Sequence, residues 1–309
     1  MNRSMYSPAW LALAMLISPM CLADEPTTSK STDIDKAPVF SATTAEPVLM
    51  RYKLKMDQVM KMGVDMDVDV HVQAGPQDIK MVQAMHFDAK ARVTEVDDKG
   101  NMACVVKITH MTMKMSGMTD IAYDSDKPDE APASFQGVAA MIDVGIPCKI
   151  SPVGELLETD LEPLRLAAQR ANNAALAKAV EDSVNQMFEG TFLQLSKDPI
   201  AAGATYKGGT ILSDKTKMHL SYKIGSVSAD KSKAVMEPSI EMEIPPDAFP
   251  GATGKITSQE SNGWQVWDVE KGCPGDAQMH MHVGMELTSN GEKATVEITT
   301  TSRMTSKVE

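Results

Sequence analysis

The chain has 309 residues, of which 43% are hydrophobic and only 5% aromatic, and its formal net charge is −12 at pH 7. This length can bury a sizeable core, either in one large domain or in two lobes. The acidic balance repels phosphate backbones and anionic lipid surfaces, so we expect no nucleic-acid partner.

The first 23 residues are typical of a signal peptide. Arg3 supplies the positive start, Ala9–Ile17 form a short apolar run, and Cys21-Leu22-Ala23 offers small residues for cleavage after Ala23. The run is well short of the roughly 20 residues that a membrane span needs, so we predict an exported periplasmic or extracellular protein with no membrane span. Lipidation of Cys21 is the alternative, although Ser18-Pro19-Met20 lacks the usual pattern before such a cysteine.

Residues 24–47 are rich in Ser, Thr, Pro and charged side chains, which predicts a flexible tether. From Leu54 to Val72 apolar and polar residues then alternate without a break, which only a β-strand with one buried face explains. At about 3.3 Å per residue this strand would run roughly 60 Å, so it must bend or twist.

Turn residues at 73–76 predict a hairpin to a second strand with apolar residues at odd positions from Ile79 to Val93. A turn at Asp97–Asn101 leads to a third strand, whose apolar phase changes from even (Met102–Ile108) to odd (Met111–Met115). The phase change predicts a β-bulge near Thr109–His110, and therefore a curved sheet.

The middle of the chain is less regular. We predict an acidic loop at 124–133, a short helix at 135–142, two strand pieces within 147–157 around Ser151–Gly154, and a helical stretch from the capping box Thr159-Asp160-Leu161-Glu162 to Phe188. The loop begins like a calcium site, but Pro128 takes the third ligand position, so a solvated loop is the favoured interpretation.

Strands resume at 218–224, 236–244 and 263–269, and the chain ends in a hairpin that pairs 277–287 with 294–300 across Ser289-Asn290-Gly291. The predicted fold is α+β, with long, curved, mainly antiparallel β-meanders in two halves and a central helical segment. We expect one β-rich domain over 48–305, which could form two lobes (48–158 and 203–305) joined by helices over 160–195.

With this layout the chain resembles the uncharacterised bacterial exported proteins grouped as domain of unknown function 6263. The matching features are the Met- and Val-rich strands after a leader and the segments Asp97–Asn101, Tyr123-Asp124-Ser125, Val144–Pro147, Ser151–Glu155 and Trp267–Gly272. The chain departs from the family by having Gly203-Ala204-Thr205-Tyr206 where a tryptophan is expected. The resemblance implies fold and export, and no activity.

Methionine is the compositional anomaly, with 25 residues, 21 of them after residue 23. Met111, Met113 and Met115 could form a pliable surface for an apolar ligand, or could pack the core, or could contribute thioethers to a copper site. Trp264 and Trp267 lie three apart and should face opposite sides of a strand, so that one packs and the other could line a cleft.

His280 and His282 share one strand face and could form half of a copper or zinc site if another strand adds a ligand. Three cysteines follow the leader. Cys104 is in phase with buried neighbours, so the candidate disulfide is Cys148 with Cys273.

No motif for catalysis or for a cofactor emerges, and we predict neither. The first functional hypothesis is an exported non-enzymatic β-rich protein that binds an apolar small molecule or an envelope protein. The alternatives are an envelope metal-binding protein and an enzyme of unknown reaction.

Overall fold

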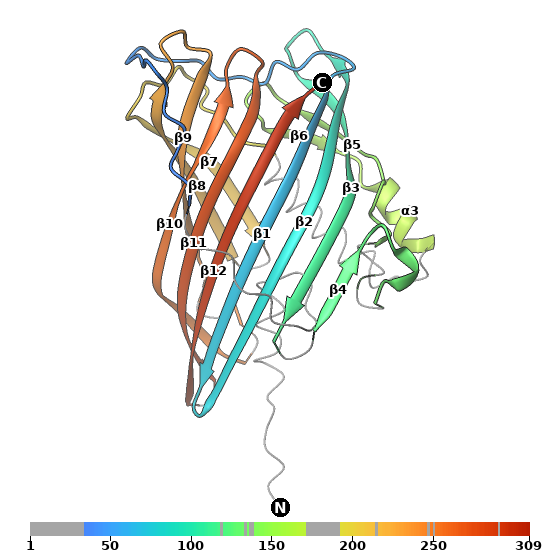
Figure 1. The fold of residues 1–309 in the computed structure, drawn as a ribbon, viewed down its shortest axis with the longest axis vertical. Coiled ribbons are helices and arrows are strands. Elements are labelled where there is room, and N and C mark those ends of the chain that lie inside the picture. The colour runs from blue at the N-terminus through green and yellow to red at the C-terminus, as the bar shows by residue number, and fades with distance from the viewer. Residues whose placement is uncertain are drawn as a thin grey trace, which may run out of the picture.

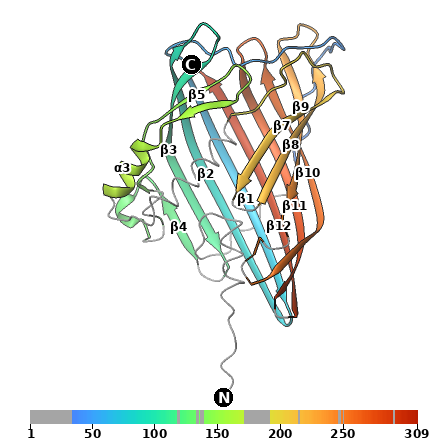
Figure 2. The ribbon, with the colours of Figure 1, turned by 180° about the vertical axis from the view of Figure 1, so that it is seen from behind.

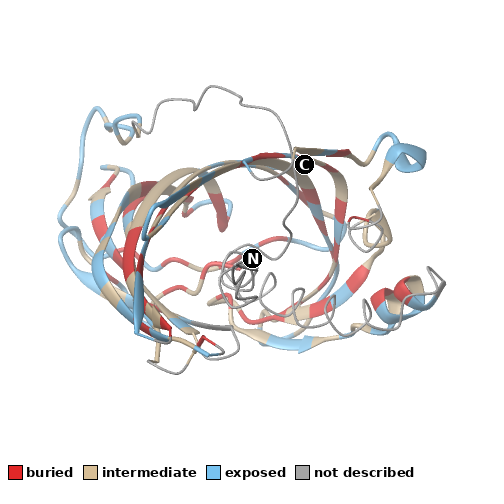
Figure 3. Cartoon of the chain, turned by 90° about the horizontal axis from the view of Figure 1, so that it is seen from below, coloured by how far each residue is buried: buried red, intermediate tan, exposed pale blue. Residues whose placement is uncertain are grey.

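In the computed structural model of this protein, the described residues are 34–117, 120–132, 135, 139–170, 192–213, 216–245, 248–249, 251–289 and 291–309. The predicted signal peptide, residues 136–138 of the predicted helix at 135–142 and the predicted helical residues 171–188 lie outside them. The described chain forms one antiparallel sheet of twelve strands, in the order β6-β5-β3-β2-β1-β12-β11-β10-β9-β8-β7, with β4 added beside β3 (Figures 1 and 2). Seen end-on, the sheet curls into an open arc (Figure 3).

The strands differ greatly in length, and the longest are at the centre of the sheet. They are β1 (Val59–Ala74), β2 (Gln77–Val96), β3 (Met102–Ser116), β4 (Ile121–Asp124), β5 (Ile146–Ile150), β6 (Leu156–Thr159), β7 (Thr205–Ser213), β8 (Thr216–Val227), β9 (Lys233–Glu243), β10 (Thr253–Asp268), β11 (Cys273–Ser289) and β12 (Glu292–Val308). A 3-10 turn, η1 (Pro128–Glu130), follows β4, and a helix, α3 (Glu162–Arg170), follows β6.

The first hairpin confirms the predicted alternation. β1 and β2 pair from Met60 with Ala91 to Val72 with Ile79, and this puts the even positions of β1 and the odd positions of β2 on the concave face. The predicted start of the strand is wrong, because a turn at Asp57, which has a positive φ of 68°, separates Leu54 from β1. Leu54 and the apolar residues from Met60 to Val72 all have even numbers, but the turn between them interrupts the strand, so the shared numbering does not place Leu54 in β1.

The predicted bulge in β3 is confirmed at Thr109. Asp88 pairs with His110 and Ala89 pairs with Ile108, so Thr109 is the extra residue. The bulge keeps Met111 on the concave face after the change of phase, because one added residue reverses the alternation.

The two halves of the chain are joined in a single sheet by β1 and β12. These strands pair over fifteen positions, from Met60 with Val308 to Ala74 with Ala294. The predicted Asn-Gly hairpin then connects β12 to β11, with Leu287 opposite Ala294. The two meanders are therefore one continuous ribbon of strands rather than separate sheets.

Three strand segments have no counterpart in the sequence-based prediction: β4, β7 and the first half of β10. β10 pairs with β9 only at its end, from Gln265 to Asp268. Before that point, side chains of β10 replace the ladder: Gln259 donates to the Ile240 carbonyl at 2.7 Å, and the Ile240 amide donates to Ser261 Oγ at 2.9 Å.

Buried side chains form three clusters on the concave side. The largest fills the end of the arc where the chain enters β1, and it includes Met60, Val93, Met102, Ile224 and Trp267. A second, around Val68, Phe249, Val283 and Val296, occupies the opposite end. A third lies beside β4. Between the two ends, the concave face carries half-buried side chains: Val64, Met66, Met279, Met281, Ser302 and Met304.

The prediction of a free tether is wrong for residues 34–47, which are attached to the second half of the sheet. The Asp35 carbonyl accepts a hydrogen bond from Trp264 Nε1 at 2.9 Å, and Thr43 bridges to Ser228. The chain then crosses the end of the arc (Figure 1), where Val48, Met50, Tyr52 and Leu54 are buried.

Helix α3 begins one step later than the predicted capping box. The amide of Glu162 donates to Asp160 Oδ1 at 2.9 Å, so Asp160 caps the helix and Thr159 ends β6. None of the described helices has the length and apolar character needed to cross a membrane.

Candidate functional site: a cleft at the rim of the sheet

The methionines proposed as a ligand surface lie in the packed interior. Met111, Met113 and Met115 are all buried, and the first two pack with Tyr123 and Phe135, whose rings stack at 5.3 Å. Because their thioethers are enclosed by side chains of β4 and of the segment after it, they act as core residues. The hypothesis that these methionines form an open ligand surface is therefore replaced by the alternative that they pack the core.

The two tryptophans face opposite sides of β10, as predicted. Trp267 is fully buried in the largest cluster, edge-on to Tyr52 at 5.0 Å. Trp264 is on the convex side, where the segment around Asp35 covers it. Both indoles are therefore packed, and neither lines an open cleft.

The paired histidines lie on the convex face of β11. His280 Nδ1 is 3.1 Å from Thr301 Oγ1, and His282 Nδ1 is 3.2 Å from Thr299 Oγ1. His282 Nε2 is also 2.9 Å from Glu297. Within the described part of the chain these residues do not belong to a group of three close metal-ligating atoms.

The cysteine that lies opposite Cys148 in the sheet is Cys104, and not the predicted partner Cys273. Cys104 on β3 and Cys148 on β5 are direct cross-strand partners, and both are buried and free. Cys273, at the start of β11, is also free. The interaction between the two thiols lowers the pKa of Cys104 and, together with burial, raises that of Cys148. The Cys148–Cys273 hypothesis is thereby corrected, because Cys104 occupies the position next to Cys148.

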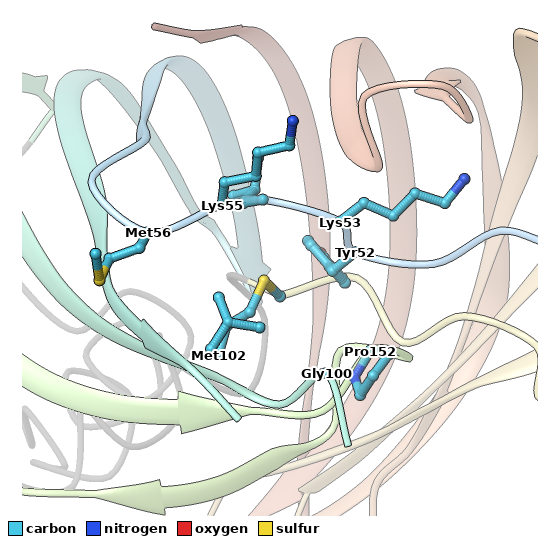
Figure 4. A pocket seen from close by; sticks show the side chains of 9 residues that line it. Tyr52, Lys53, Lys55, Met56, Gly100, Met102 and Pro152 are labelled. Atoms are coloured by element: carbon cyan, nitrogen blue, oxygen red, sulfur yellow. The ribbon is translucent and has the colours of Figure 1, made fainter. Parts of the chain in front are cut away.

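An open cleft of about 440 Å³ lies at the rim of the arc, where the segment before β1 crosses the β2–β3 turn (Figure 4). We call it the rim cleft. It is mainly apolar, and its volume falls within the range of small-molecule sites. Its lining residues are Tyr52, Lys53, Leu54, Lys55, Met56, Val96, Gly100, Met102 and Pro152.

The floor of the rim cleft is rigidly built. Tyr52, Leu54 and Met102 are buried, and the Tyr52 amide donates to the Pro152 carbonyl at 2.8 Å. The Tyr52 hydroxyl accepts a hydrogen bond from the Leu193 amide at 2.9 Å, and burial raises the pKa of this phenol. A neutral hydroxyl that is already bonded to the backbone makes the floor apolar on the side of the cleft.

The mouth of the rim cleft combines exposed apolar side chains with two cations. Met56 is 64% exposed and Val96 is 40% exposed, so two large apolar side chains face solvent at the same cleft. Lys53 Nζ donates to the Val269 carbonyl at 2.8 Å, whereas Lys55 extends into solvent beside the cleft (Figure 4). The sequence did not indicate this site, because its walls come from three separate turns.

A second cleft, of about 520 Å³, lies across β12, β1 and β2 around Gly63. Three lysines from adjacent strands line it, Lys61, Lys90 and Lys307, together with Asp88. Two of its three lysines are already engaged, because the Glu309 side chain pairs with Lys61 and Lys307, and these lysines lower the pKa of that carboxyl. This makes it a weaker candidate than the rim cleft.

No protein-family model matches the chain, and no curated protein matches it either. Among solved structures, the chain is similar to lipovitellin, from a study of lipid–protein interactions, with 11% identity over 83% of this chain and a TM-score of 0.48. It spans only 26% of that lipovitellin chain. Weaker similarities include Pseudomonas aeruginosa OccK5 (8% identity, 81% of this chain and 98% of the other, TM-score 0.22) and a DUF1329 family protein from Desulfovibrio piger (6% identity, 77% and 83%, TM-score 0.14).

Proposed function

We propose that this is an exported, non-enzymatic protein that binds an amphiphilic small molecule with an apolar chain and an anionic end group. The export rests on the leader-like first 23 residues. We also keep the relationship to domain of unknown function 6263 as a proposal. The single observation that supports the ligand class is the rim cleft, in which a buried apolar floor meets exposed apolar walls.

The apolar part of the proposal follows from Met56 and Val96. An exposed methionine and an exposed valine facing one cleft cost solvation free energy that a bound chain would recover, at about 25 cal/mol per Å² covered. Met56 is also adaptable, because its unbranched side chain can reshape around different chains. The half-buried methionines of the concave face offer further apolar surface of the same kind.

The anionic part follows from Lys55. Lys55 has no ion-pair partner within the described residues, whereas Asp57 pairs with Arg92 and Asp97 pairs with Lys149. An ammonium at the mouth of an apolar cleft favours a ligand whose acidic group remains in solvent while its chain is buried.

The test uses residues 24–309 and a fluorescent 16-carbon fatty acid, with its methyl ester as the uncharged comparison. Met56→Asp and Val96→Asp should each weaken binding of both probes by about tenfold or more, because either places a charge against the apolar chain. The matched control is Leu157→Asp on β6, since Leu157 is 45% exposed and lies outside the cleft. Binding that is unaffected by the cleft variants, or equally affected by the control, would overturn the proposal.

The charge is tested separately. Lys55→Glu should weaken binding of the acid and leave binding of the ester unchanged, and Lys80→Glu, on the outer face of β2, should change neither. A Lys55→Glu variant that binds acid and ester with unchanged preference would remove the anionic group from the proposal. Circular dichroism and the Tm of every variant establish that the sheet is intact.

A further inference from the structure

The convex face carries a strip of histidines and carboxylates where β1, β2, β3 and β4 lie side by side (Figure 1). The bulge at Thr109 turns His110 to the outside, opposite Asp88 on β2. The ring of His86 lies 6.1 Å from that of His110. Asp124 at the end of β4 and Asp126 in the turn after it add two further carboxylates at the same place.

Three residues in this strip meet closely enough to share one ion. One ligand atom from each of His110, Asp124 and Asp126 lies within 4.8 Å of the other two. His110 Nδ1 is 3.2 Å from Asp126 Oδ1, which is close to the spacing of about 3.4 Å between two ligands of a tetrahedral metal with bonds of about 2.1 Å.

The turn that holds these groups is fixed to β3 by two hydrogen bonds between Ser125 and Met111. The Ser125 amide donates to the Met111 carbonyl at 2.9 Å, and the Met111 amide donates to Ser125 Oγ at 2.9 Å. This reciprocal pair locks the turn onto β3 one residue from His110. The site is therefore anchored to a strand rather than carried by a free loop.

The carboxylates of the strip form no ion pair with lysine or arginine within the described residues. Within the described residues, Asp65, Asp88 and Asp126 have only histidines as salt-bridge partners. Asp124 has none there. Arg303 on β12 is the cross-strand neighbour of Asp65 on β1, but the two side chains form no ion pair. Four carboxylates around two imidazoles produce a negative potential that a divalent cation would relieve.

We propose that His110, Asp124 and Asp126 form a binding site for one divalent transition-metal ion, of which Zn²⁺ fits best. A nitrogen ligand with two carboxylate oxygens suits Zn²⁺ with a water molecule in the fourth position. Ca²⁺ is disfavoured because it takes six to eight oxygen ligands and the imidazole supplies none. Cu(I) is disfavoured because the nearby methionine sulfurs are buried on the opposite face.

The test is equilibrium dialysis of chelator-treated protein against Zn²⁺ with elemental analysis, and a parallel titration with Co²⁺ followed by visible absorption. The wild-type protein should bind one equivalent, and the Co²⁺ form should show the d–d bands of a low-coordinate site. His110→Gln, Asp124→Asn and Asp126→Asn should each lower the affinity at least about tenfold. Asp126 is 76% exposed, so its substitution leaves the fold undisturbed.

The matched control is the double variant His280→Gln/His282→Gln, which removes two imidazoles from the same convex face without touching the site. It should bind Zn²⁺ as the wild type does. Loss of binding in the double variant with retention in His110→Gln would overturn the proposal. So would the absence of a stoichiometric site, or preferential binding of Ca²⁺ that ignores His110. The rim-cleft ligand plays no part in this experiment, so the two proposals succeed or fail separately.

Discussion

Single residues determine how the crossing segment is fastened over the end of the arc. Gly272 has a positive φ of 67°, and a Cβ at this position would lie 2.4 Å from the backbone nitrogen of Lys53. The Lys53 amide donates to the Gly272 carbonyl at 3.1 Å. Only glycine allows this approach of two backbones, so Gly272 supports the floor of the rim cleft from behind.

We expect Gly272→Ala to lower the free energy of unfolding by about 2–4 kcal/mol, because backbone strain and a clash with the Lys53 backbone add. Gly291→Ala is the control, since Gly291 also has a positive φ but has open space around it, and it should cost about 1 kcal/mol. Urea denaturation of both variants gives the comparison. Equal losses would show that the close approach contributes nothing.

The β2–β3 turn contains a residue whose charge state affects stability. Asn101 donates to Asp97, and Lys149 pairs with it, so the pKa of Asp97 is held well below 3.8. A carboxyl whose pKa is lowered by folding stabilises the folded state at neutral pH, and this contribution is lost as the pH falls through its folded-state pKa.

The unfolding free energy of the wild type should therefore fall more steeply than that of Asp97→Asn as the pH is lowered below about 4. Urea denaturation at steps of half a pH unit measures both curves. Parallel curves over this range would contradict the assignment.

Among the secondary-structure elements, the sequence predicted those strands and turns that a regular alternation of apolar and polar residues marks. The phase change between Ile108 and Met111 located the bulge, and Asn290-Gly291 located the last hairpin. β7 was missed because Gly208 and Gly209 interrupt its pattern; the ring of Tyr222 occupies the place of the missing Gly208 side chain. The first half of β10 was missed because Gln259 bonds to the backbone of β9 instead of packing.

The candidate site was even less accessible to sequence reasoning. The metal-ligating atoms of His110 and Asp126 come from positions sixteen apart that meet only through the β3–β4 pairing. In the rim cleft, Met56 matched the alternation of β1 but belongs to the preceding turn, which turns it outward. A one-dimensional pattern reports the face of a strand, and it cannot report which turns converge in space.

The pairing of β3 with β5 makes a prediction about the cysteines. Cys104 and Cys148 are opposite one another, at a Cα separation of about 4.5–5.5 Å that an antiparallel pair shares with many disulfides. Oxidised glutathione should convert the two thiols to a disulfide and be reduced to two glutathione molecules. The closed loop of about 45 residues should raise the free energy of unfolding by about 4 kcal/mol.

Peptide mapping without reduction identifies the bond, and Cys273→Ser should leave it unchanged. Denaturation of oxidised and reduced protein then gives the stability difference. A bond between Cys148 and Cys273 would contradict the cross-strand pairing.

For the whole molecule, one sheet implies one cooperative unit. The fifteen paired positions between β1 and β12 link the first half to the second, and the largest cluster includes residues of both halves. Neither half can lose its strands without exposing the core of the other. The two lobes that the sequence allowed are thus expected to behave as a single domain.

Urea unfolding followed by fluorescence of Trp264 and Trp267 reports on β10, while hydrogen exchange of β2 and β3 reports on the first half. The two midpoints should coincide within experimental error, because the halves share their core. Two resolved transitions would show that the halves fold independently.

The pairing of the first long strand with the last one also governs the order of events during synthesis. After β2 has been synthesised, one side of β1 remains unpaired while roughly 200 further residues are added, which takes about 10–40 s at ordinary rates of elongation. Throughout that time the unpaired edge of β1 exposes backbone amides and carbonyls that a strand of another chain could bind. Slow translation of a chain with this topology would therefore prolong the exposure of the β1 edge and raise the risk of aggregation.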